Sequence, residues 1–125
     1  MTGGLVIGLA RRAKSRAPME LLEHAAIAKS GGVAADFRGV SRTRQVTVLF
    51  AEDWAAACAE LGREVAWTVR RANVLVSGLA NPRTAGGLLG LGSARIRVRG
   101  QTDPCAKMDA AVPGLRAALT PAWRG

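Results

Sequence analysis

Among the residues able to do chemistry, Cys105 has the most informative surroundings. It follows Asp103, a good helix N-cap, and Pro104, which suits the first position of a helix. The sequence therefore predicts a helix that begins here, with Cys105 in its first turn. Unpaired amide N–H groups and the helix dipole stabilise a thiolate, so we expect the pKa of Cys105 to fall below the free value of about 8.5. This predicts a reactive cysteine; the alternative is a thiol kept for packing in a short helix.

The second cysteine and the single histidine form no comparable site. One stripe of a predicted helix over residues 52–61 carries Trp54, Ala55, Cys58 and Leu61. We therefore expect Cys58 to face the core with a structural role. His24 has no cysteine or carboxylate pair at metal-ligand spacing, so a zinc site or a Cys–His dyad is unsupported. Neither a dinucleotide fingerprint nor a P-loop is present.

The elements that must position these residues can be read from hydrophobic patterning. Apolar, β-branched or alternating runs predict strands at residues 5–9, 45–50, 73–77 and 94–99. The helix over residues 52–61 has acids in its first turn and Gly62 just beyond its end. Residues 19–29 have helix-favouring composition, but a helical turn followed by a strand is equally allowed.

The strand at residues 94–99 alternates strictly. Ile96 and Val98 fall on one face, and Arg95, Arg97 and Arg99 fall on the other. We interpret the arginine face as a solvated sheet surface, in preference to an anion-binding groove.

Composition limits the classes of function. The chain has 125 residues, of which 49% are apolar, so we expect one domain over residues 1–125 with a packed core. The longest apolar runs, at 46–51 and 54–59, fall far short of the roughly 18 residues that span a bilayer. Two cysteines cannot build a disulfide framework, which favours a reducing cytoplasm.

The net charge of +9 is typical of a protein that binds polyanions. However, the basic residues are nearly all arginine in a chain rich in alanine and glycine, as expected from a GC-rich genome. Aromatic residues make up only 4%, so surfaces for base stacking are sparse. We therefore do not expect nucleic acid as a partner, and a basic nucleic-acid-binding module is kept as an alternative function.

Four blocks in a fixed order carry a family resemblance. They are Arg-Gln-Val-Thr-Val at 44–48, Ala-Glu-Asp-Trp at 51–54, Arg-Arg-Ala-Asn-Val-Leu-Val at 70–76 and Gly-Gln-Thr-Asp-Pro-Cys-Ala-Lys-Met-Asp at 100–109. With these blocks the chain resembles the MOSC domain family, named for the C-terminal domain of molybdenum-cofactor sulfurases, as a short stand-alone bacterial-type member. The likeness runs over residues 5–125.

The resemblance implies a mostly β, α+β fold with short helices, arranged as a MOSC-like β-barrel. It implies that Cys105 carries sulfur as a persulfide or coordinates the molybdenum of a pterin-type cofactor, in sulfur transfer or in reduction of N-hydroxylated compounds. The residues that the family pattern assigns to the cofactor are Arg71, Asn73, Thr102 and Asp103, with Arg44 as a weaker candidate. A sulfur donor or redox partner protein is implied, whereas pyridoxal phosphate is not expected on this chain.

Relatives commonly continue beyond the point where this chain ends, at Gly125, into another strand pair. The barrel could therefore lack its C-terminal closing strands, through truncation or because a partner completes it in trans. An open sheet edge invites self-association. A non-catalytic barrel fragment that acts as an interaction surface is thus a further alternative.

Overall fold

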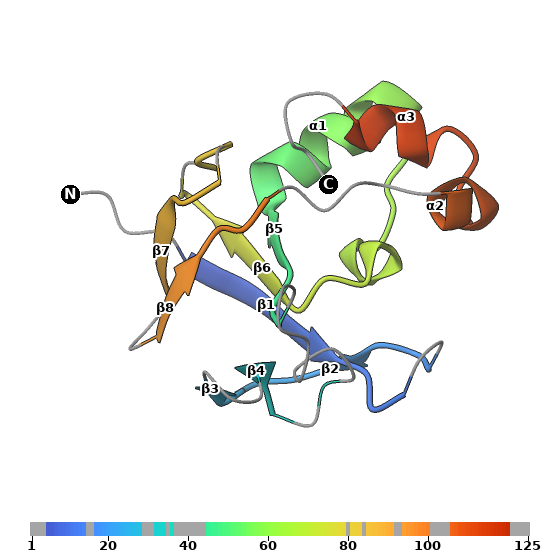
Figure 1. Cartoon of the computed structure of the whole chain (residues 1–125). Coiled ribbons are helices and arrows are strands. Elements are labelled where there is room, and N and C mark those ends of the chain that lie inside the picture. Colours follow the sequence, from blue (N-terminus) through green and yellow to red (C-terminus); the bar gives the residue numbers. More distant parts are fainter. Residues whose placement is uncertain are drawn as a thin grey trace.

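The computed structural model describes residues 5–14, 17–28, 32–34, 36, 45–79, 81–83, 85–91, 94–100 and 106–120 (Figure 1). Its strands are β1 (Leu5–Arg11), β2 (Glu20–Leu21), β3 (Ile27–Ala28), β4 (Gly32–Val33), β5 (Val48–Phe50), β6 (Val74–Ser77), β7 (Leu88–Leu91) and β8 (Ala94–Arg97). Its helices are α1 (Ala51–Leu61), the 3-10 helix η1 (Trp67–Arg70), α2 (Ala106–Ala111) and α3 (Leu115–Leu119). The expected mixed α+β fold with few, short helices is confirmed.

The main sheet has the strand order β2-β1-β6-β5. β5 runs parallel to β6, and β1 runs antiparallel to both β6 and β2. The hairpin of β7 and β8 stands beside this sheet (Figure 1). Phe50, Val76 and Leu89 are buried between them, and Ile96 and Val98 pack against this group. In the described part of the chain the strands form separate sheets, and no closed barrel is seen.

A second apolar cluster joins the sheet to the helices. Leu49 and Leu75 pack against α1 and against α3, whose Leu115 and Leu119 are 0% and 1% exposed. α1 follows β5 without a loop, as the sequence predicts, and ends at Gly62, whose φ of 69° is the left-handed conformation that glycine adopts readily.

The face that α1 buries is rotated from the predicted one. Asp53, Trp54 and Ala57 are buried, whereas Ala55 is exposed, so placing Ala55 on the core stripe was wrong. Cys58 is half-buried and packs against the helical cluster, as expected. The rotation has a physical cause: Asp53 has polar partners in the loop that follows β6, and that loop covers this side of the helix.

Gly8 allows a close approach between β1 and η1. A Cβ atom at this position would lie 2.7 Å from Cζ2 of Trp67 and 3.2 Å from Cβ of Leu75. The pairing of β1 with β6 also shifts register between Val6 and Gly8, as a β-bulge does. The bare backbone at Gly8 therefore lets the Trp67 indole lie directly on the strand.

The sequence left open whether residues 19–29 form a helix or a helical turn followed by a strand. Residues 17–28 are all described; they contain β2 and β3 and no helix. Helices α2 and α3 follow β8, and the predicted helix start at Asp103 and Pro104 lies outside the described residues. No helix in the described part of the chain is long and apolar enough to cross a membrane.

Candidate functional site

Arg71 lies at the turn between η1 and β6. Its backbone has a φ of 63°, and its N–H donates to the carbonyl of Thr68 at 3.0 Å, which ends the 3-10 helix. A left-handed backbone is uncommon for a residue with a Cβ and is held here by the surrounding structure. The half-buried side chain donates from Nη2 to the carbonyl of Ala17. The guanidinium is thus aimed at the connection between β1 and β2.

Asn73, two residues further on, serves as a brace between strands. Its side chain is buried, with 4% of the residue exposed. Nδ2 donates to the carbonyl of Ala10 at 3.1 Å, and Oδ1 accepts from the N–H of Thr47 at 3.0 Å. One amide therefore ties β1, the approach to β5 and the start of β6 together. The geometry gives Asn73 a role in holding the Arg71 turn.

The segment between β1 and β2, which Arg71 contacts at Ala17, is itself basic. Arg11 forms an ion pair with Glu20 at 3.4 Å and donates to the carbonyl of Ala34 at 3.1 Å. Lys14 is exposed, and its carbonyl accepts from the N–H of Ala17 at 3.2 Å. Arg71 thus lies against a turn that carries further cations, which suits an anionic ligand.

Arg70 connects this turn to the C-terminal helices. It is buried, with 7% exposed, and its Nη1 lies 3.9 Å from Sδ of Met108 on α2. Met108 is three residues beyond Cys105 in the chain. The structure therefore brings the Arg70–Arg71 turn and the helix that follows Cys105 to the same part of the molecule.

A model of the MOSC domain family matches residues 31–120 of the chain. The chain belongs to the MOSC domain family. The matched segment contains every residue that the sequence assigned to a site.

Two solved structures share the fold of this MOSC domain. The crystal structure of the YuaD protein from Bacillus subtilis has a TM-score of 0.73 and 18% identity, and the match covers 100% of this chain and 87% of that one. The crystal structure of YiiM from Geobacillus stearothermophilus has a TM-score of 0.68 and 14% identity, over 94% of this chain and 62% of that one. At these identities the likeness shows the fold alone. No curated protein sequence matches the chain.

The structure places two of the predicted site residues of this MOSC domain, Arg71 and Asn73. Arg44, Thr102, Asp103 and Cys105 lie outside the described residues. Within the described part of the chain, no group of three or more histidine, cysteine or acidic residues could hold a metal ion. The roles assigned to all six residues stay predictions.

Sequence reasoning missed the contributions of Arg70 and of the basic turn. The arginine doublet at 70–71 was visible, but only the three-dimensional structure shows that its first member is buried against α2. The run of cations after β1 could have suggested an anion site, but nothing in the sequence shows that Arg71 meets Ala17.

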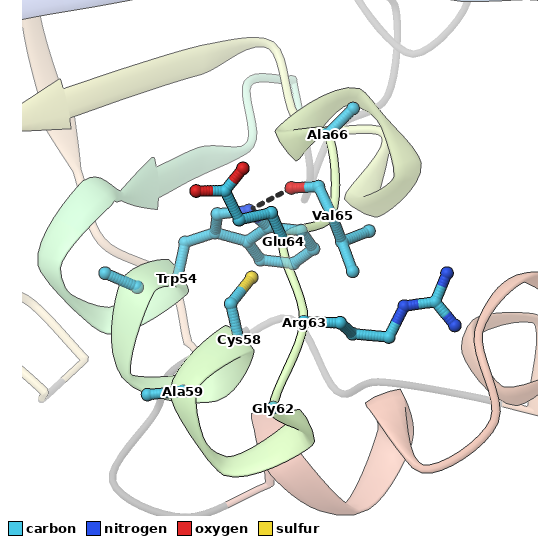
Figure 2. A pocket seen from close by; sticks show the side chains of 9 residues that line it. Trp54, Cys58, Ala59, Gly62, Arg63, Glu64, Val65 and Ala66 are labelled. Carbon is cyan, nitrogen blue, oxygen red and sulfur yellow. Dashed lines mark hydrogen bonds between the residues drawn. The ribbon is translucent and has the colours of Figure 1, made fainter.

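The other cysteine of the MOSC domain, Cys58, lines an open hollow beside α1 (Figure 2). The far side of the hollow is the chain from Gly62 to Ala66, which is held to the helix because Nε1 of Trp54 donates to the carbonyl of Val65 at 3.0 Å. The side chains of Arg63 and Glu64 lie at its rim. Cys58 thus packs at the edge of the helical cluster, in agreement with the structural role expected for it.

Proposed function

We propose that this MOSC domain binds a pterin-type molybdenum cofactor or carries sulfur as a persulfide, and that Cys105 is the residue that does the chemistry. Membership of the MOSC family supports a function of this class. The observation that carries the proposal for this chain is the contact between Arg70 and Met108, because it joins the turn that carries Arg71 to the helix that follows Cys105.

The residues in the described part of the chain fit the anionic part of such a cofactor. Arg71 is a permanent cation with five N–H donors, of which the described structure uses one, on Ala17. The neighbouring turn adds Lys14, which is exposed. Arg71 would hold the phosphate through a bidentate contact, and Asn73 would act by fixing the backbone that carries Arg71. When bound, the cofactor would supply a molybdenum centre, for which thiolate is a suitable soft ligand.

The sulfur-carrier form of the proposal uses the same thiolate without a metal. The Cys105 sulfur would attack the outer sulfur of a persulfide on a donor protein, forming a new S–S bond as the donor's S–S bond breaks. The donor leaves as a thiolate, so electrons and atoms balance. Both forms require an ionised Cys105, and they differ in whether molybdenum or an additional sulfur atom is found with the protein.

Anaerobic purification followed by metal analysis and intact-mass spectrometry tests the proposal. We expect the wild type to carry molybdenum or one additional sulfur atom, and Cys105→Ala to carry neither. Cys58→Ala is the matched control, since it also removes one thiol, and it should behave as the wild type. If all three proteins lack both molybdenum and bound sulfur, or if Cys105→Ala retains either, the assignment to Cys105 is wrong.

A second candidate function rests on the outer edge of β1. β2 pairs only with Ala10 and Arg11, so residues 5–8 have no partner on that side among the described residues. Leu5, Val6 and Ile7 are 68%, 44% and 54% exposed. An exposed apolar edge of this kind is a template for a further strand.

We propose that a second copy of the chain supplies this strand, paired antiparallel about the two-fold axis of a dimer. Residues 5–10 carry no charge. Antiparallel pairing about residues 6 and 7 would place the two copies of Arg11 roughly 30 Å apart. This is beyond the Debye length of about 8 Å at physiological salt, so the repulsion between the two arginines would be largely screened. Sedimentation should show a concentration-dependent dimer for the wild type and a monomer for Ile7→Lys. A wild type that stays monomeric would exclude dimerisation through the edge of β1.

A further inference from the structure

The exposed face of the β7–β8 hairpin carries a row of arginines. Arg95, Arg97 and Arg99 are all exposed, whereas Ile96 and Val98 between them pack against the inner cluster. Arg95 and Arg97 lie in β8, and Arg99 follows it where the N–H of Val98 still bonds to the carbonyl of Gly87 at 2.8 Å. Alternate residues of an extended chain are about 6.7 Å apart, so the three positions span about 13 Å. Within the described part of the chain none of the three side chains donates a hydrogen bond or forms an ion pair.

The neighbouring strand leaves a low, uncharged surface beside this row. Arg95 is paired with Gly90, and Arg97 is paired with Leu88. Directly paired residues of an antiparallel ladder lie on the same face. Gly90 has open space above its backbone, and Leu88 is 62% exposed. The arginines therefore stand along a surface that another backbone can approach closely.

Acidic side chains are absent from this region of the sequence. Residues 65–102 contain six arginines and no Asp or Glu. Of these arginines, Arg83 is neutralised by Asp53 at 2.9 Å, and Arg70 is buried. The three on the hairpin are thus an exposed, uncompensated part of the net charge of +9.

In contrast to the expectation from the sequence, which favoured a solvated surface, we propose that the outer face of the β7–β8 hairpin binds the backbone of single-stranded nucleic acid. Guanidinium groups pair with phosphates in a bidentate manner, and an extended strand offers one phosphate per nucleotide at regular intervals to a regular row of cations. Carboxylates of an acidic peptide would match the row only if acidic residues alternated along an extended strand, whereas every nucleic-acid strand has this regular repeat. The exposed Leu88 favours a single strand over a duplex, because unpaired bases can lay their faces on an apolar side chain. The absence of aromatic residues on the hairpin predicts little sequence preference.

Fluorescence anisotropy with labelled oligothymidine, measured on the full chain across salt concentrations, tests this. Each phosphate contact contributes about 0.7 to the slope of log affinity against log salt for single strands. Removing three contacts in R95Q/R97Q/R99Q should therefore flatten the slope by about 2. Between about 50 and 200 mM salt, the wild type should lose about 18-fold more affinity than this variant.

The matched control is R63Q/R116Q, which removes two exposed charges elsewhere; it is compared with R95Q/R97Q, which has the same net charge, +9 less 2, or +7. The control should keep the wild-type slope, whereas R95Q/R97Q should flatten it by about 1.4. Equal flattening in the two double variants, or no binding by the wild type at the lowest salt, would overturn the proposal. The same measurement with a DNA duplex and with polyglutamate separates the alternatives. An affinity for the duplex equal to that for oligothymidine would overturn the single-strand assignment. An equal affinity for polyglutamate would identify the partner as an acidic protein instead.

Discussion

Replacing Asn73 by alanine should destabilise the protein in the absence of any ligand. The substitution removes the partners of two backbone groups, the carbonyl of Ala10 and the N–H of Thr47. A buried polar group left without a partner costs about 1–3 kcal/mol. Ala10 is 0% exposed, but Thr47 is half-buried and water can partly replace the lost bond, so we expect a total loss of about 2–4 kcal/mol. This is a large part of the 5–15 kcal/mol that is typical of a folded domain.

Urea denaturation of the ligand-free protein measures this loss. With a slope of about 1.5 kcal/mol per molar urea, a loss of about 3 kcal/mol lowers the midpoint by about 2 M. Ser77→Ala, at the other end of β6, removes a side chain without a hydrogen bond in the described structure and should cost less than about 0.5 kcal/mol. If Asn73→Ala costs no more than Ser77→Ala, Asn73 does not brace the strands, and a direct role in ligand binding becomes the better explanation.

Two further substitutions test how the fold is held. Gly8→Ala places a Cβ 2.7 Å from the Trp67 ring. We therefore expect the free energy of unfolding to fall by about 1–3 kcal/mol and calorimetry to show a lower Tm. An unchanged Tm would show that the ring can move aside freely. Asp53→Ala removes the carboxylate that binds Arg83 at 2.9 Å. The loop after β6 should then open more often, so trypsin should cleave after Arg83 faster than in the wild type. Equal cleavage rates would show that this ion pair does not hold the loop.

Much of the local structure could be predicted because neighbouring residues determine it. The β-branched run before Ala51 and the glycine after Leu61 are sufficient for β5 and α1. The same holds for β8, where alternation alone indicates which face is buried. In these elements, hydrophobic period and capping agree with the tertiary packing.

The predictions that were wrong or incomplete depend on distant partners. Ala55 was placed on the buried stripe because hydrophobicity alone could not show that Asp53 would be buried by Arg83, thirty residues away. In the same way, the sequence does not show that the amide of Asn73 bonds to Ala10 and Thr47, whereas its predicted role at a cofactor stays a prediction. Long-range hydrogen bonds have no periodic signal in a single sequence.

The central claim concerns the ionisation of one thiol and can be measured directly. In a Cys58→Ala background Cys105 is the only cysteine, so the rate of its alkylation against pH reports its thiolate alone. The account predicts a midpoint clearly below the free-cysteine value of about 8.5, because the amides of the predicted helix start would favour the anion. A midpoint at or above that value, or a thiol that never reacts in the folded protein, would contradict it.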